Sequence, residues 1–75
     1  MPPDPLLDTR GLSCPLPVLK ARKALMGLAP GACLRVLATD PKTPEDFRAF
    51  CESTGHRLVE SAEAGGEYAF VIERR

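Results

Sequence analysis

Two closely spaced prolines, Pro15 and Pro17, constrain this chain more than any other feature, because they limit where a helix can start. Proline lacks an N–H group and fits a helix only in its first turn. The apolar run that follows, from Val18 to Leu28, has the spacing of an amphipathic helix. We therefore expect the helix to begin at Cys14 or within one residue of it.

The cysteine before the first proline, Cys14, is expected to be the N-cap of this helix. A residue that precedes proline favours extended dihedral angles, as N-cap residues do. Its sulfur would then lie beside the free N–H groups of Leu16 and Val18 and the positive end of the helix dipole. These groups favour a thiolate, so we expect a pKa below the roughly 8.5 of a free cysteine. The alternative is a cysteine packed as a small hydrophobic residue, but the two prolines and the preceding Gly11 favour a reactive thiol.

Length and composition point to one small domain, residues 1–75, in which the proline-rich residues 1–5 form a flexible lead-in. Ten basic and ten acidic side chains cancel, so bulk charge gives no reason to expect nucleic acid or a membrane surface as a partner. No apolar run approaches the ~20 residues that span a bilayer. Three widely spaced cysteines fit a reducing compartment better than a disulfide framework, so we expect a cytoplasmic protein.

Hydrophobic periodicity predicts the order strand, helix, strand, helix, strand, strand. The expected strands cover residues 6–10, 32–39, 57–62 and 68–73, the last two joined by a hairpin turn at 64–66. Thr43 is a plausible N-cap of the second helix, with Pro44 in its first position. Two right-handed crossovers would place both helices on the same face of a four-stranded sheet. The predicted fold class is an α/β two-layer sandwich whose other sheet face is open.

The remaining cysteines are predicted to have packing roles. Cys33 lies in an alternating strand, and Cys51 shares an apolar helical stripe with Phe47, Phe50 and Thr54. The chain has no Cys-x-x-Cys motif, and its single histidine and wide cysteine spacing argue against a zinc site. A dithiol oxidoreductase and a metal protein are therefore both disfavoured.

Five residues spaced as D-x-x-G-x-x-C-P-x-P resemble the signature of the TusA (SirA-like) sulfur-carrier family. They are Asp8, Gly11, Cys14, Pro15 and Pro17. The similarity continues through Arg22-Lys23, Pro30-Gly31, Asp40-Pro41 and Phe50-Cys51, and so covers nearly the whole chain. For the fold, the resemblance implies a two-layer sandwich with a mixed four-stranded sheet.

For the function, the resemblance implies a sulfurtransferase in which Cys14 accepts a sulfane sulfur as a persulfide and passes it on. The implied donor is a cysteine desulfurase or a rhodanese-type protein. The implied acceptor is a protein with a reactive cysteine, in tRNA thiolation, molybdenum cofactor supply or sulfur oxidation. We expect no cofactor beyond the transient persulfide, and no direct nucleic-acid or membrane partner. Leu16 stands where some members of the family carry an acidic residue.

The candidate site combines a catalytic cysteine with residues that shape or support its surroundings. Pro15 and Pro17 are expected to shape the helix start around the nucleophile Cys14. The supporting candidates are Gly11, Leu16, Val18, Arg22, Lys23, Asp8 and Asp40.

Three of these candidates carry more specific expectations. Arg22 falls within the predicted apolar arc of the helix, so it either covers apolar surface or serves the site. Together with Lys20 and Lys23 it either steers an acidic partner or forms a solvated face. Asp8 and Asp40 are expected to brace loops, Asp40 through an Asx-type turn.

The rival hypothesis is a non-catalytic adaptor or nucleic-acid-binding module on the same fold, with Cys14 as a structural helix cap. That hypothesis predicts that Cys14→Ser retains function, whereas a sulfur carrier would lose it.

Overall fold

The computed structural model describes residues 4–75, and the predicted order of elements is confirmed. The strands are β1 (Leu6–Thr9), β2 (Cys33–Ala38), β3 (Arg57–Ala64) and β4 (Glu67–Glu73), and the helices are α1 (Leu16–Met26) and α2 (Thr43–Thr54). Part of the expected lead-in, residues 1–3, lies outside the described residues. The carbonyl of Pro5 accepts a hydrogen bond of 2.9 Å from the Arg35 N–H, so the chain is already paired with β2 just before β1 begins.

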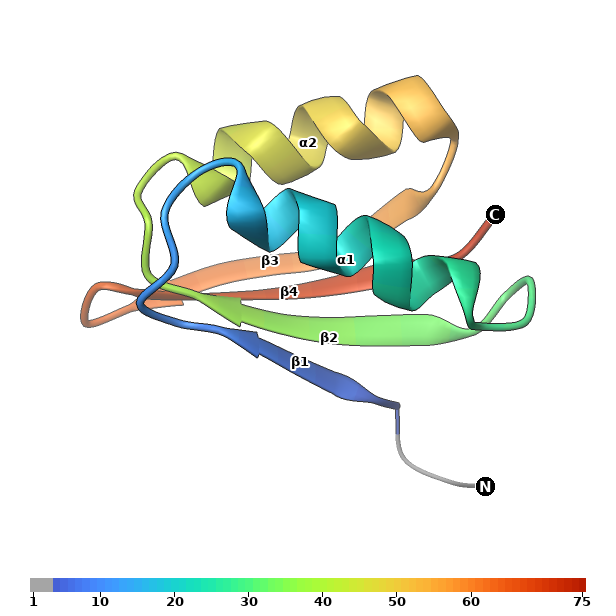
Figure 1. The fold of residues 1–75 in the computed structure, drawn as a ribbon, viewed down its shortest axis with the longest axis horizontal. Helices are drawn as coiled ribbons and strands as arrows, with labels where there is room; N and C mark the ends of the chain where they lie inside the picture. The colour runs from blue at the N-terminus through green and yellow to red at the C-terminus, as the bar shows by residue number, and fades with distance from the viewer. Residues whose placement is uncertain (1–3) are drawn as a thin grey trace.

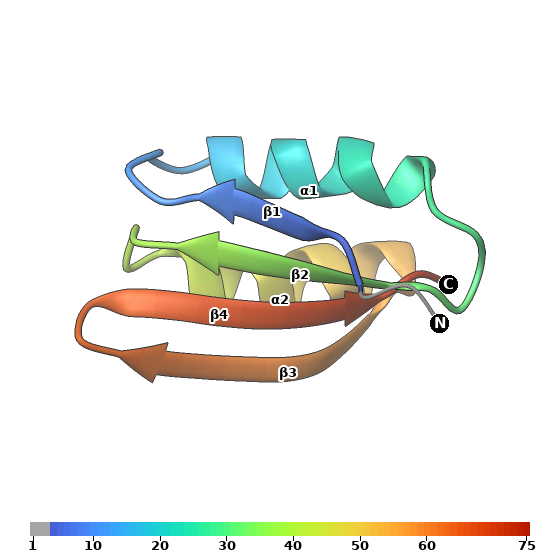
Figure 2. The same ribbon diagram turned by 90° about the horizontal axis from the view of Figure 1, so that it is seen from below.

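The four strands form one mixed sheet in the order β1-β2-β4-β3. β1 runs parallel to β2, with Leu6 opposite Arg35, while β4 is antiparallel to both of its neighbours. Both helices cover one face of the sheet (Figure 1), and the view from below shows the other face open (Figure 2). The predicted two-layer α/β sandwich is therefore confirmed. The core lies on the covered face, and no helix of residues 4–75 packs on the open face (Figure 2).

The core lies between the two helices and the covered face of the sheet. Its buried apolar residues are Ala21, Leu25, Leu34, Val36, Ala38, Phe47, Phe50, Cys51, Phe70 and Ile72. The rings of Phe47 and Phe70 join α2 to the sheet, with centroids 4.7 Å apart. The predicted stripe of α2 is buried at Phe47, Phe50 and Cys51, whereas Thr54 is half-buried.

The buried side of α1 matches the predicted apolar arc in part. Ala21 and Leu25 are buried as predicted, together with Pro17, and Val18 and Leu28 pack against the core. Leu19 and Met26, which the same arc included, are exposed. The helix is apolar at most positions, so its sequence alone permits several orientations. α1 packs against β1 and β2, and the small side chains of Pro17 and Ala21 on its buried side let the helix approach the sheet closely.

Several element boundaries differ from the predicted ones by one or two residues. α1 ends at Met26 rather than continuing to residue 28, because Gly27 is its C-cap: the Gly27 N–H donates to the Ala24 carbonyl (3.1 Å) and the Leu28 N–H donates to the Leu25 carbonyl (3.0 Å). The N-cap of α2 is Lys42 instead of Thr43. β3 continues to residue 64, two residues beyond its predicted end.

Candidate functional site

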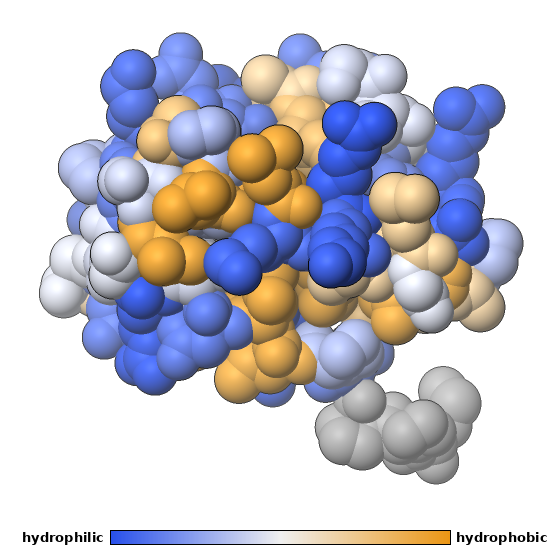
Figure 3. Space-filling model, in the orientation of Figure 1, coloured by the Kyte–Doolittle hydropathy of each residue, from blue (hydrophilic) through white to orange (hydrophobic). Residues whose placement is uncertain are grey.

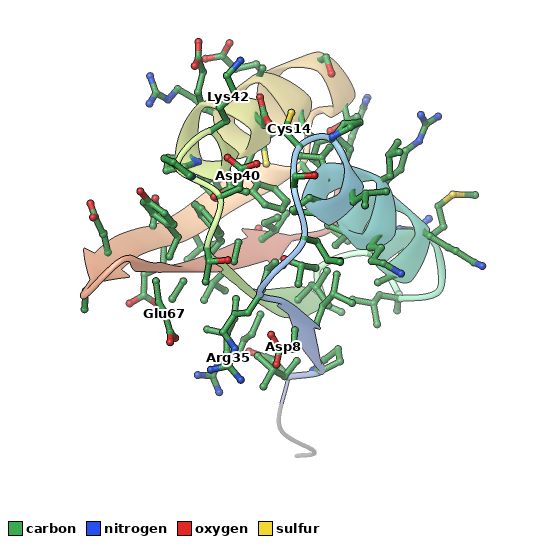
Figure 4. All side chains as sticks on the ribbon, turned by 60° about the vertical axis from the view of Figure 1, so that its left-hand side comes forward. Asp8, Cys14, Arg35, Asp40, Lys42 and Glu67 are labelled. Atoms are coloured by element: carbon green, nitrogen blue, oxygen red, sulfur yellow. The ribbon has the colours of Figure 1, made fainter. Side chains whose placement is uncertain are left out.

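Two loops meet at one end of the sheet because β1 and β2 are parallel and each is followed by a helix (Figure 1). The β1–α1 loop carries Cys14, and the β2–α2 loop carries Asp40 and Lys42 (Figure 4). Asp40 joins them: its Oδ2 accepts a hydrogen bond from the Cys14 N–H (2.7 Å), and its Oδ1 accepts one from the Lys42 N–H (2.9 Å). The Asx-type turn predicted at Asp40 is thus present, and the same carboxylate fixes the cysteine backbone.

A second contact between the loops involves Gly11. Its N–H donates a hydrogen bond of 2.9 Å to Thr39 Oγ1. Gly11 has a φ of +82°, in the left-handed region that side chains disfavour. The backbone freedom predicted for Gly11 is therefore used, at the turn that leads the chain from β1 toward the cysteine.

The prediction that Cys14 caps α1 is wrong. The N-cap is Pro15 and the helix begins at Leu16, so Cys14 precedes the cap by one residue. The Leu16 N–H donates to the Ser13 carbonyl (2.9 Å) and is not free for the sulfur. The physical reason is that Pro17 is tolerated at the second helical position as well as the first, because N–H groups throughout the first turn lack intrahelical partners. The helix therefore starts later than the first proline suggested.

The predicted lowering of the Cys14 pKa is also wrong, although the residue is exposed as expected. A hydrogen bond with the Asp46 carboxylate is the largest of the effects that raise the pKa of this thiol, followed by desolvation and the negative charge of Asp46. Asp40 raises the pKa further, and Lys42 acts in the opposite direction. The sulfur therefore lies in surroundings that favour the neutral thiol.

A groove of about 430 Å³ opens beside Cys14, between α1 and α2. It is lined by Cys14, Pro15, Val18, Asp46, Ala49, Phe50 and Ser53. The α2 residues of this lining were not among the predicted site residues. The signal for them is their spacing, since positions 46, 49, 50 and 53 fall on one face of a helix. Phe50 therefore packs in the core and also lines the groove.

The predicted basic residues lie away from this groove. Arg22 and Lys23 are exposed further along α1, and Lys20 and Lys23 border a different hollow, next to Leu7. Arg22 is exposed and does not cover the core, although Ala21 and Leu25 of the same predicted arc are buried. Leu16 is 42% exposed and Leu19 is 52% exposed, and Figure 3 shows apolar and basic side chains side by side over α1.

Asp8 also lies apart from the cysteine (Figure 4). Its carboxylate accepts hydrogen bonds from Arg10 Nε (2.9 Å) and Nη2 (2.8 Å), which lower the Asp8 pKa to about 2. Arg10 in turn lies 3.5 Å from the Glu67 carboxylate at the start of β4. Asp8 therefore braces a loop, as predicted, but at the edge of the sheet rather than at the sulfur.

Residues 4–75 show neither a metal-binding cluster nor a membrane-spanning helix. No group of three or more histidine, cysteine or acidic side chains in this range could hold a metal ion. No helix in the same range has the length and apolar character to cross a membrane.

The fold and the Cys-Pro-Leu-Pro segment at the start of α1 place the protein in the class of SirA-like proteins. A crystal structure of a SirA-like protein from Desulfitobacterium hafniense has the same architecture, with a TM-score of 0.81 over 92% of this chain and 95% of that one, at 27% sequence identity. The chain belongs to the TusA sulfurtransferase family, whose model matches residues 6–74.

Curated relatives narrow the role within this family. The sulfur carrier protein TusA of Allochromatium vinosum is 48% identical over 95% of this chain and 93% of its own length. The sulfur carrier protein TusA of Pseudomonas paraeruginosa is 45% identical over 99% of this chain and 94% of its own length. These relatives support a sulfur-carrier role, which requires sulfur donor and acceptor proteins as partners.

The contact between Asp40 and the cysteine backbone gives a first testable prediction. In Asp40→Asn only one side-chain oxygen remains, so the bond to Cys14 or the bond to Lys42 is lost. We expect faster amide hydrogen exchange at Cys14 or Lys42, measured by NMR. Because the bonds from the Lys42 and Cys14 N–H groups lower the Asp40 pKa from its usual 3.8, this bracing is complete above that value and is lost as falling pH protonates the carboxylate.

Asp8→Asn is the matched control for this experiment, since Asp8 accepts a similar bond from the Arg10 N–H (3.0 Å) but none from the N–H groups of Cys14 or Lys42. It should leave exchange at Cys14 and Lys42 unchanged. If Asp40→Asn also leaves both amides as protected as in the wild type, Asp40 does not hold the loops together.

Proposed function

We propose that this protein is a sulfur carrier that takes a sulfane sulfur from a donor protein onto Cys14 as a persulfide and relays it to an acceptor protein. The observation that carries the proposal is the exposed Cys14 thiol at the edge of an open groove. Cys51 is buried in the core, and Cys33 is half-buried in the sheet. Membership of the TusA family and the sulfur-carrier relatives support the same role.

The proposed loading step is an exchange between sulfur atoms. Cys14 Sγ attacks the outer sulfur of the donor's persulfide, and a new S–S bond forms as the donor's own S–S bond breaks. The donor sulfur leaves with the bonding electron pair and receives the proton that Cys14 gives up. The acceptor's thiol then gives up its proton and attacks the outer sulfur, the Cys14 S–S bond breaks, and Cys14 Sγ leaves with the bonding electron pair and takes that proton. No net oxidation occurs, so the proposal needs no redox cofactor.

The nucleophile in such an exchange is the thiolate, whereas the free protein favours the thiol. We therefore expect ionisation of Cys14 to accompany docking, with the donor supplying positive charge or hydrogen-bond donors at the groove. The exposed cations of α1, among them Arg22 and Lys23, are available to an acidic region of the same partner. A cysteine desulfurase or a rhodanese-type protein is the proposed donor.

The proposal specifies the acceptor and the pathway only by class. The acceptor is a protein with a reactive cysteine, serving tRNA thiolation, molybdenum cofactor supply or sulfur oxidation. The odd number of cysteines fits a cytoplasmic, reducing location. The structural cap that the rival adaptor hypothesis assigns to Cys14 is absent, because α1 has no side-chain cap hydrogen bond and Cys14 precedes the cap position. The rival is otherwise distinguished by its prediction that Cys14→Ser retains function.

The proposal is tested by intact-protein mass spectrometry after incubation with cysteine and a cysteine desulfurase, or with thiosulfate and a rhodanese. We expect a gain of one sulfur atom that maps to Cys14 by peptide analysis and is removed by a reductant. A protein that gains no sulfur from either donor, or gains it at Cys33 instead, would contradict the proposal.

A further inference from the structure

The groove beside Cys14 is apolar except at one point on α2. Pro15, Val18, Ala49 and Phe50 contribute apolar surface, and Ser53 is uncharged. Asp46 is the one acidic side chain of this lining, and no basic side chain among residues 4–75 lines it. Asp46 lies half-buried in the first turn of α2. A carboxylate in this position is not needed to complete the core, which suggests a role toward the sulfur.

We propose that Asp46 is a positioning residue for sulfur transfer: its carboxylate holds the resting Cys14 thiol through a hydrogen bond and repels the anionic outer sulfur once Cys14 is loaded. The second part of this inference rests on the proposed sulfur-carrier function. The first part concerns the free thiol alone.

The charges around the sulfur come from α2 and from the β2–α2 loop. α2 contributes Asp46, which lines the same groove as Cys14 and has the largest effect in raising the pKa of its thiol, and the β2–α2 loop contributes Asp40 and Lys42. α1 has no acidic residue in its first turn, and its basic residues are not part of the groove lining. Two carboxylates therefore oppose one ammonium group at the sulfur, and Asp46 has the larger effect of the two carboxylates. This arrangement disfavours any anion on Cys14.

Loading moves the negative charge without removing it. An anionic donor persulfide and the Cys14 thiol are converted into a donor thiol and an anionic Cys14 persulfide, so the thiol proton moves to the donor. The outer sulfur then stands about 2.05 Å beyond Sγ. Repulsion by the Asp46 carboxylate is smaller when this sulfur points to the mouth of the groove, which is where an acceptor cysteine would arrive.

The first experiment measures how fast iodoacetamide alkylates Cys14 across a range of pH, with peptide mapping of the modified site. In Asp46→Asn the midpoint of the profile should move to lower pH. Lowering the Cys14 pKa by about 1 raises the thiolate fraction at pH 7 about tenfold, and the weaker nucleophilicity of a more acidic thiol reduces the gain in rate to about threefold. In a variant that stays folded, a purely structural role of Asp46 would not move this midpoint.

Glu45→Gln is the matched control, because Glu45 is an exposed acid in the same turn of α2 and is not part of the groove lining. It should leave the midpoint unchanged. The buried Cys51 reports on folding, since its alkylation would reveal an unfolded variant, in which case Asp46→Ser replaces Asp46→Asn. An unchanged midpoint in a folded Asp46 variant, or an equal displacement in Glu45→Gln, would overturn the proposal.

The second experiment applies the same titration to protein loaded chemically with inorganic polysulfide. The midpoint for alkylation of the outer sulfur should also move to lower pH in Asp46→Asn, by less than that of the free thiol because the charge is further away. An unchanged outer-sulfur midpoint would overturn the repulsion. Failure of the proposed function is a different result: enzymatic donors would then deliver no sulfur to Cys14, while the free-thiol titration would still respond to Asp46.

Discussion

Cys14→Ser is expected to abolish sulfur loading from both enzymatic donors while leaving the fold intact. The substitution removes the sulfur that the groove exposes, and serine is a far weaker nucleophile toward a persulfide. Stability should change little, because the side chain is exposed and is not part of the core. Intact mass spectrometry after donor treatment measures the loss, and circular dichroism with thermal melting checks the fold.

Cys33→Ser is the control for this prediction. Cys33 is a free, half-buried cysteine on a different part of the molecule, and burial raises the pKa of its thiol. This variant should accept sulfur at the wild-type rate. If the Cys14→Ser protein still accepts one sulfur atom, or if Cys33→Ser is the variant that fails, the carrier thiol has been wrongly assigned.

The sequence predicted the position of the cysteine at the start of α1 well, because the prolines that follow it are a strong local signal. Prolines restrict the start of a helix to a few positions, and the observed start is within two residues of Cys14. The same rule could not decide between Pro15 as first helical residue and Pro17 as second, because neither position needs an N–H group. That ambiguity decides whether the sulfur lies at the cap or before it.

The electrostatics of Cys14 could not be predicted in the same way. The expected effect of the helix dipole is local, whereas the observed effect comes from Asp46, which is distant in the sequence and reaches the sulfur only through the packing of α2 beside α1. In sequence terms Asp46 is an ordinary acidic residue in the first turn of a helix. Only the crossover from β2 to α2 gives it a second role.

The contrast between the two helices has a similar origin. In α2 the apolar residues are few and aromatic, so the stripe through Phe47 and Phe50 had one possible orientation. In α1 apolar residues surround most of the helix, and the sheet selected the side with Pro17 and Ala21. Periodicity predicts an orientation only when the polar residues are numerous enough to exclude the others.

Phe47→Ala is expected to have the largest effect on stability. Phe47 is fully buried, and its ring packs against Phe70 of β4. Truncating a buried phenylalanine typically lowers the free energy of unfolding by about 3–5 kcal/mol. At roughly 0.05–0.15 kcal/mol per residue, a domain of this size has only about 4–11 kcal/mol in total. Urea denaturation followed by circular dichroism should show a large fall in the midpoint, or a protein that is partly unfolded without urea.

Leu19→Ala tests whether this effect belongs to the core rather than to any loss of apolar surface. Leu19 is 52% exposed on α1, so its truncation should change the free energy of unfolding by about 0.5 kcal/mol or less.

Because α2 carries both Asp46 and Phe47, loosening of this helix in Phe47→Ala should also free the Cys14 thiol from the Asp46 carboxylate. Faster alkylation of Cys14 in Phe47→Ala, at a temperature where most molecules are folded, would show that the core sets the state of the sulfur. Comparable destabilisation by Leu19→Ala would contradict the assignment of Phe47 to the centre of the core.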